Sequence, residues 1–191
     1  MSPTTRFLVS HVFIALVVNF SILSDLIRFD NTALCEEGSF VEDISFFSFL
    51  AGAFVFFSAS FHREGFARFG ARALAVAYLA FFLREVDVAD HNVPFPLKQL
   101  GSNLLKDTLV GLAALAFGFV FLRRYRDRIP ALLASHRLLF TRLLLLGSAL
   151  FVIASGFEQR DLMVVEEILE TNAAFAFFVA SLLFSQSDPL R

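Results

Sequence analysis

The sequence has few of the side chains that keep a protein of this size in water. Only 18% of its 191 residues are charged, whereas 57% are hydrophobic and the mean hydropathy is +0.70. A soluble domain needs about a quarter of its residues charged to cover its surface. The apolar residues, 27 of them Phe, stand in long runs between short charged segments. The composition argues against a soluble globular domain and predicts an integral membrane protein.

Cysteine, tryptophan and lysine are scarce. Cys35 is the single cysteine and there is no Trp. One cysteine excludes a disulfide framework, and the chain has no CxxC or Cys/His cluster for zinc or an iron–sulfur centre. Lys98 and Lys106 lie in or beside a loop, which argues against a retinal Schiff base within a span. The formal net charge of −2 lacks the basic footprint that nucleic-acid binding requires, so we expect no nucleic-acid partner.

Six stretches are long and apolar enough to cross about 30 Å of hydrocarbon, which takes roughly 20 helical residues. The connections between them carry charges or prolines, and none is long enough for a soluble domain. The sequence therefore predicts an all-α, polytopic bundle of six transmembrane helices that forms a single domain over residues 1–191. The predicted spans are residues 7–27, 44–61, 66–88, 105–122, 138–157 and 163–184.

Charges are distributed unevenly over the connections. If the N-terminus is cytoplasmic, all arginines except Arg28, Arg84 and Arg160 fall on the inner side. Both lysines fall on the outer side. This positive-inside pattern predicts that both termini are cytoplasmic. Of the 18 acidic residues, only Glu64, Asp127 and Asp188 fall inside, so the outer face is acidic and attracts cations.

A basic run, Arg123-Arg124-Tyr125-Arg126-Asp127-Arg128, follows the fourth span. Its simplest interpretation is a topology determinant that rests on phospholipid headgroups. A regulatory or anionic-lipid-binding element is the alternative interpretation.

The third span ends in charges that lie at membrane depth. Its uninterrupted apolar run, residues 73–83, is too short to cross the bilayer. If Arg72 lies at the inner interface, then Arg84, Glu85 and Asp87 lie about 18–22 Å further out, still within the hydrocarbon. These three residues therefore belong to the outer third of the membrane.

The sixth span also carries charges at membrane depth, in its first half rather than at its end. Counting back from Phe184 puts Glu170 about 21 Å from the inner edge, at a depth similar to that of Arg84. Glu166, Glu167 and Glu170 share one face of the helix, because residues three and four apart lie close together around its axis. The outer end of the first span adds Asp25 and Arg28 at the same level.

A charge at such depth costs about 2.5–3.5 kcal/mol, so these residues should turn inward and pair, Arg84 with Glu170. Three glutamates against one arginine leave negative charge to be balanced by protonation, a bound cation or water. A salt-bridged helix pair that only fixes the geometry of the bundle is the structural alternative. The predicted ionic cluster comprises Asp25, Arg28, Arg84, Glu85, Asp87, Glu166, Glu167 and Glu170.

A metal site is a further hypothesis for the same region. His91 follows Asp87 by four residues, which puts both on one face if the helix continues. Carboxylate oxygens and an imidazole suit Mn, Fe or Zn, so a divalent metal ion is the candidate cofactor. The candidate metal ligands are Asp87, His91, Glu166, Glu167 and Glu170.

The Arg84-Glu85-x-Asp87 and Glu166-Glu167-x-x-Glu170 motifs resemble those of small, uncharacterised bacterial inner-membrane proteins, which pair an Arg-Glu-x-Asp helix end with a late Glu-Glu-x-x-Glu helix. The resemblance covers most of the chain and implies a location in the bacterial cytoplasmic membrane, with no particular activity. By span count and outer polar cluster the chain is also similar to metal-dependent hydrolases of the alkaline ceramidase type. It lacks their late His-x-x-x-His motif.

We therefore expect a membrane-embedded binding or accessory protein whose outward-facing cluster holds a proton, a cation or a charged segment of a partner. A metal-dependent hydrolase acting on a lipid or a small outer-face substrate is one alternative. A cation- or proton-coupled transporter is another. The expected partners are membrane lipids and another membrane subunit.

Overall fold

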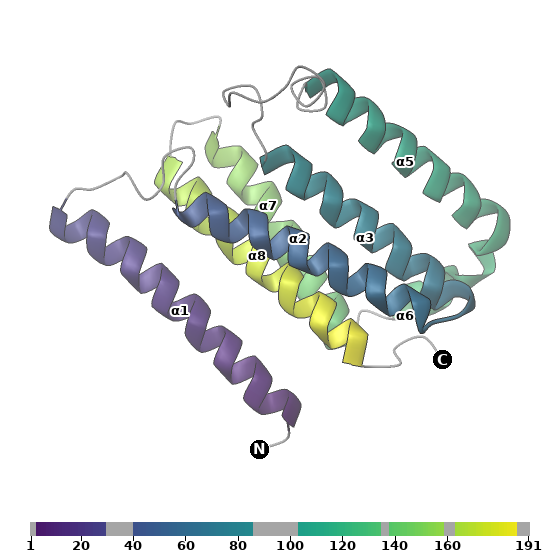
Figure 1. Ribbon diagram of the computed structural model, residues 1–191, viewed down its shortest axis with the longest axis horizontal. Helices are drawn as coiled ribbons and strands as arrows, with labels where there is room; N and C mark the ends of the chain where they lie inside the picture. The colour runs from purple at the N-terminus through teal and green to yellow at the C-terminus, as the bar shows by residue number, and fades with distance from the viewer. Residues whose placement is uncertain (1–2, 30–39, 86–102, 135–137, 159–162, 187–191) are drawn as a thin grey trace.

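The computed structural model describes residues 3–29, 40–85, 103–134, 138–158 and 163–186. Throughout these residues the regular structure is helical, which confirms the predicted all-α class. Two short elements, η2 and α6, follow the fourth long helix (Figure 1). The helices are α1 (Pro3–Phe29), α2 (Phe40–Phe61), α3 (Gly65–Glu85), α5 (Asn103–Arg124), η2 (Arg126–Arg128), α6 (Ile129–Ala134), α7 (Leu139–Glu158) and α8 (Met163–Gln186).

The long helices coincide with the predicted spans. In the described residues α3 extends to Glu85, so the last three positions of the predicted span 66–88 lie outside the described residues. Four helices, rather than six, are long and apolar enough over their described residues to cross a membrane, and α1 contributes a shorter apolar stretch, Ser10–Ser24. The four segments are Asp43–Phe61, Gly65–Leu83, Leu139–Phe157 and Val164–Gln186.

Helix α8 lies at the centre of the bundle and contacts α7, α2 and α1, while α3 packs on α2 and α5 packs on α3 (Figure 1). Helices α2 and α8 run parallel, because Ser45 meets Thr171 near both starts and Phe56 meets Phe184 near both ends. We call the end where α2 and α8 begin the glutamate end. The opposite end, which holds the α2–α3 turn, η2 and the end of α8, is the arginine end.

Close approach of three helices depends on a glycine. Tyr78 of α3 lies across Gly52 of α2, where an added Cβ would come within 2.6 Å of the Tyr78 ring. The Tyr78 hydroxyl donates a hydrogen bond to the carbonyl oxygen of Phe177 in α8, at 2.7 Å. The missing side chain at Gly52 therefore lets α3 reach past α2 to α8.

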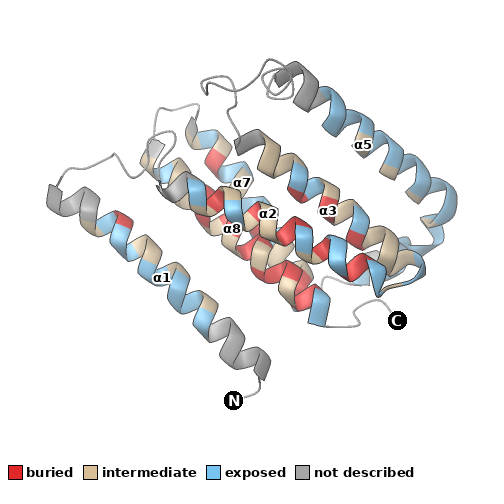
Figure 2. Ribbon diagram, in the orientation of Figure 1, coloured by how far each residue is buried: buried red, intermediate tan, exposed pale blue. Residues whose placement is uncertain are grey.

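Helices α1 and α5 lie at the two sides of the bundle and bury little of their surface. Ile22 is the only buried residue among the described side chains of α1, and α5 has none (Figure 2). Large apolar side chains such as Phe20, Leu115 and Phe119 are more than half exposed. An exposed apolar surface of this extent is typical of helices that face a membrane or a partner protein.

Candidate functional site

The first half of α8 carries glutamates on its inward face. Glu170 is only 5% exposed, and Glu166 lies one turn earlier on the same face. Seven residues after Glu170, Phe177 contacts the rings of Phe49 and Phe81, with centroids 5.9 and 5.7 Å apart. Glu166 and Glu170 each make a polar or electrostatic interaction. The inward face of α8 thus changes from apolar to acidic toward the glutamate end.

Hydroxyl groups fasten the neighbouring position of α8 to α2. Thr171 and Ser45 are both buried, and their hydroxyl oxygens are 3.2 Å apart. Glu167, half-buried, lies one turn before Thr171 on the same side of α8. The start of α2 therefore forms one polar wall beside the glutamates.

A pair of carboxamides fastens α8 to α1. Asn19 donates a hydrogen bond to the Oδ1 of Asn172 at 3.0 Å, and Asn172 donates one to the Oδ1 of Asn19 at 2.8 Å. Each amide nitrogen also donates to a carbonyl of its own helix, that of Ala15 or Ile168. All four amide N–H groups and both amide oxygens of the pair are thus satisfied, as burial among apolar helices requires.

The Tyr78–Phe177 hydrogen bond fixes the level of α3 against α8. The two helices run antiparallel, so residues after Tyr78 and residues before Phe177 extend in the same direction. Arg84 follows Tyr78 by six residues, about 9 Å along the bundle, and Glu170 precedes Phe177 by seven, about 10.5 Å. The helix positions of Arg84 and Glu170 therefore lie at similar levels along the bundle. The side chains of Arg84 and Glu85 lie outside the described part of the chain. The pairing of Arg84 with Glu170 therefore stays a prediction.

The Asn19–Asn172 pair fixes the level of α1 in the same way. Asp25 is six residues beyond Asn19 and Glu166 six before Asn172, so their helix positions share one level. Helix α1, however, packs on the face of α8 that carries Asn172, which lies opposite the face that carries Glu170. The positions of Asp25 and Arg28 thus lie across α8 from those of Arg84 and Glu85.

A packed aromatic layer lies between the glutamates and the arginine end. Phe49 and Phe177 are buried, and the ring of Phe81 stacks on Phe49 at 5.3 Å and meets Phe151 edge-on at 5.0 Å. Tyr78, only 1% exposed, completes the layer with edge contacts to Phe49 and Phe177. This layer fills the interior of the bundle between the glutamates and the arginine end.

Part of the predicted metal site cannot be compared with the structure. Asp87 and His91 lie outside the described residues. Among the residues that are described, no group of three or more His, Cys, Asp or Glu side chains is arranged to hold a metal ion. Glu166, Glu167 and Glu170 lie within about one turn of α8 but do not form such a group by themselves. The metal hypothesis therefore stays a prediction that depends on Asp87 and His91.

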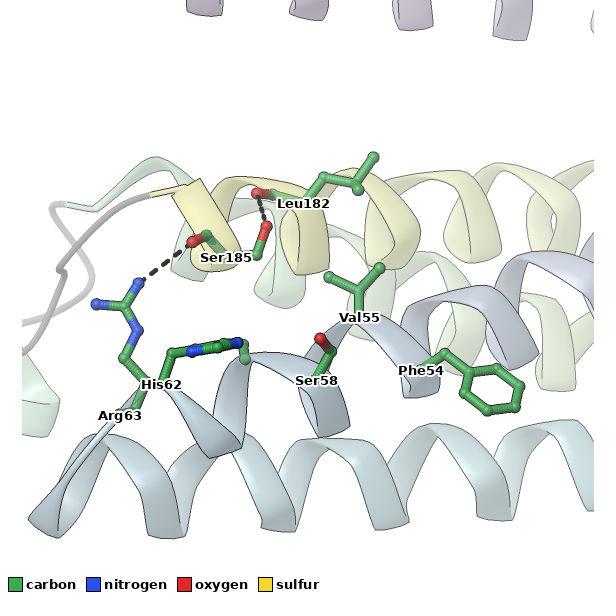
Figure 3. A pocket seen from close by; sticks show the side chains of 8 residues that line it. Phe54, Val55, Ser58, His62, Arg63, Leu182 and Ser185 are labelled. Atoms are coloured by element: carbon green, nitrogen blue, oxygen red, sulfur yellow. Dashed lines mark hydrogen bonds between the residues drawn. The ribbon is translucent and has the colours of Figure 1, made fainter.

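A separate cavity of about 440 Å³ lies at the arginine end, beside His62 and Ser185 (Figure 3). Arg63 donates hydrogen bonds to the carbonyl oxygens of Phe184 and Ser185 at 3.2 and 3.3 Å. These carbonyls belong to the last turn of α8, where a cation complements the helix dipole. Arg63 therefore caps the C-terminal end of α8, which is a structural role.

Sequence reasoning missed the residues that align the helices. Asn19 interrupts an apolar run and Asn172 directly precedes one, and a search for carboxamides at matching depth would have paired them. Ser45, Thr171 and Gly52 gave no such signal, because small residues are common throughout these runs. The charged residues in the sequence therefore predicted where the site lies, but not the contacts that align the helices around it.

Comparison with known proteins gave no relative for this chain. No protein-family model matches it, and no curated protein or solved structure matches it significantly. The class of protein is defined by the structure alone: over the described residues it is an all-helical bundle, with four helices apolar enough to cross a membrane and one buried carboxylate, that of Glu170.

Proposed function

We propose that the chain is a six-span protein of the bacterial cytoplasmic membrane that binds a cation from the outer face at its glutamates. Glu170 holds the cation, and Glu166 and Glu167 of the same helix add negative charge near it. The protein is a binding or accessory subunit in this proposal. Both termini are cytoplasmic, so the glutamate end faces outward and the arginine end inward.

The burial of Glu170 is the observation that carries the proposal. A carboxylate with 5% exposure on the inward face of an apolar helix must be protonated, paired or bound to a cation. Two further acids of α8 share its level, and α3 brings Glu85 together with Arg84 to that level. On this side of α8, Glu85, Glu166, Glu167 and Glu170 stand against Arg84, and this excess of acids favours a bound cation, of which the proton is the smallest.

The aromatic layer favours a binding site over a transport route. A transporter needs a path that opens alternately to the two ends, whereas Phe49, Tyr78 and Phe177 fill the interior directly below the glutamates. The hydrolase alternative requires a metal held by Asp87 and His91. The hydrolase alternative predicts that Asp87→Asn loses both a stoichiometric metal and hydrolytic activity.

The test is native mass spectrometry of the protein extracted gently from its own membranes, which reports bound metals, lipids and partner subunits together. Glu170→Gln is compared with Glu64→Gln, the same change at an exposed residue in the α2–α3 turn. Thermal unfolding is measured over a series of pH values and of Na⁺, Mg²⁺, Mn²⁺ and Zn²⁺ concentrations, because a bound cation raises the unfolding midpoint.

We expect the wild type and Glu64→Gln to show the same cation- or proton-dependent rise in midpoint, and Glu170→Gln to lose it. A stably inserted Glu170→Gln protein that keeps the full response would contradict the proposal. A partner chain that remains bound in all three proteins, without any cation effect, would make the glutamates structural.

A further inference from the structure

A second polar site lies at the arginine end, between α3 and α5. A cavity of about 560 Å³ opens there, lined by Arg68 and Arg72 of α3 and Arg124 of α5. Its apolar wall is aromatic: Phe69 contacts Phe117 at 5.6 Å and Tyr125 at 4.9 Å. Two helices thus converge on one cavity with three guanidinium groups above a hydrophobic floor.

No carboxylate offsets these charges within the lining of the cavity. The two acidic residues nearest in the sequence are Glu64, exposed in the α2–α3 turn, and Asp127, which pairs with Arg126 on the exposed η2 at 3.7 Å. Arg68 donates from its Nε to the carbonyl oxygen of Arg63 at 2.6 Å, which anchors its side chain at the rim. The guanidinium of Arg124 lies over the Tyr125 ring, 5.8 Å from its centroid.

The face of α5 that carries the cavity lining is apolar and partly exposed. Leu109, Val110 and Val120 share this face and are 46%, 39% and 40% exposed. A ligand that suits both parts has an anionic group for the arginines and a hydrocarbon tail for the helix surface. Guanidinium groups bind phosphate oxygens through several charge-assisted hydrogen bonds, more strongly than they bind neutral groups.

We propose that this cavity binds the phosphate headgroup of an anionic glycerophospholipid of the inner leaflet. Its acyl chains lie along the apolar face of α5 that carries Val120, Val110 and Leu109. The inference goes beyond the cation site at the glutamate end and rests only on the membrane embedding proposed above. It also assigns Arg124 of the basic run to a defined cavity, and leaves Arg126 and Arg128 of that run outside the cavity.

The test is a lipid titration of the delipidated full-length protein in neutral detergent, followed by native mass spectrometry. Phosphatidylglycerol is compared with phosphatidylcholine of the same acyl chains, and inorganic phosphate is added as a competitor. The Arg72→Gln/Arg124→Gln variant removes two charges from the cavity. Its matched control, Arg126→Gln/Arg128→Gln, removes two charges from η2 at the same end.

We expect phosphatidylglycerol to bind at least about tenfold more tightly than phosphatidylcholine, since each arginine at a membrane surface contributes about fivefold. The cavity variant should lose most of this preference and the η2 control should change it about twofold or less. Glu170→Gln should bind the lipid as the wild type does, so failure of the cation site is distinguishable from failure of this one.

Equal binding of the two lipids by the wild-type protein overturns the proposal without any variant. An equal loss in the two double variants also overturns it, because the attraction would then belong to the whole basic end. Displacement of the lipid by inorganic phosphate as effectively as by phosphatidylglycerol would identify a site for free anions instead.

Discussion

At the residue scale, the contact of Tyr78 with Gly52 organises three helices at once. The Tyr78 ring is buried against the backbone of α2, and its hydroxyl donates to a carbonyl of α8. A helix carbonyl already accepts a hydrogen bond within its own helix, so Tyr78 adds a second donor through the remaining lone pair. Gly52 is therefore constrained by the space that a neighbouring aromatic ring occupies.

We predict that Gly52→Ala destabilises the protein. The added methyl group would lie 2.6 Å from two Tyr78 ring carbons, so the ring must move and its hydrogen bond to Phe177 weakens. Overpacking of this kind costs about 1–3 kcal/mol, less the gain of about 0.5–1 kcal/mol from replacing a helical glycine. Thermal or denaturant unfolding in detergent measures the loss.

Gly111→Ala is the matched control, because nothing lies within 4 Å of an added Cβ at that position of α5. There the helix-propensity gain acts alone, and we expect unchanged or slightly raised stability. If both alanine variants unfold at the wild-type midpoint, the ring does not occupy the space that the structure gives it.

At the element scale, the helix ranges were predictable and the helix neighbours were not. Long apolar runs ended by charges are read directly from the sequence, and six long helices lie where those runs lie. Apolar surfaces do not select one another in lipid, so packing depends on small residues and hydrogen bonds that carry little sequence signal. The level of Glu170 followed from counting residues, whereas its inward face and the separation of α1 from α3 by α8 required the structure.

The Asn19–Asn172 pair gives a prediction for the attachment of α1. Apart from this pair, the described contacts of α1 with α8 are mainly those of Ile22 with Val164 and Ile168 and of His11 with the Phe178 ring. Asn19→Leu leaves Asn172 with an unsatisfied amide and should destabilise the protein. A double-mutant cycle with Asn172→Leu should give a coupling energy of about 0.6–1.7 kcal/mol.

Ser21→Ala serves as the control for this cycle. The Ser21 hydroxyl is exposed and bonds to the carbonyl of Val17 in its own helix, so no coupling with Asn172→Leu is expected. Equal coupling energies for Ser21 and Asn19 would indicate a general effect of polarity in α1 rather than a specific bond.

At the scale of the whole molecule, the two ends of the bundle differ in charge. Buried Glu170 and half-buried Glu166 and Glu167 of α8 lie toward one end, and the arginines of the α2–α3 turn, α5 and η2 lie at the other. A membrane-embedded bundle with this polarity has its arginine end in the cytoplasm. The orientation can be tested without knowing the ligand.

The single cysteine makes that test direct. Cys35 belongs to the segment between α1 and α2, outside the described residues, and the proposed topology puts this segment on the outer side. A membrane-impermeant maleimide should therefore label wild-type cells whose outer membrane has been opened. In a Cys35→Ser/Asp127→Cys variant the side chain at position 127, 95% exposed at the arginine end, should react only after the inner membrane is permeabilised. The reverse pattern would contradict the orientation.

The central place of α8 has a consequence for the order of assembly during synthesis. Of the six long helices, α8 is made last, yet α1, α2 and α7 all pack on it. Among the described residues, the contacts between the earlier long helices are those of the α2–α3 hairpin and of α3 with α5. In the proposed membrane protein, buried Glu170 therefore inserts in the same step that completes the bundle, after the helices that surround it have been made.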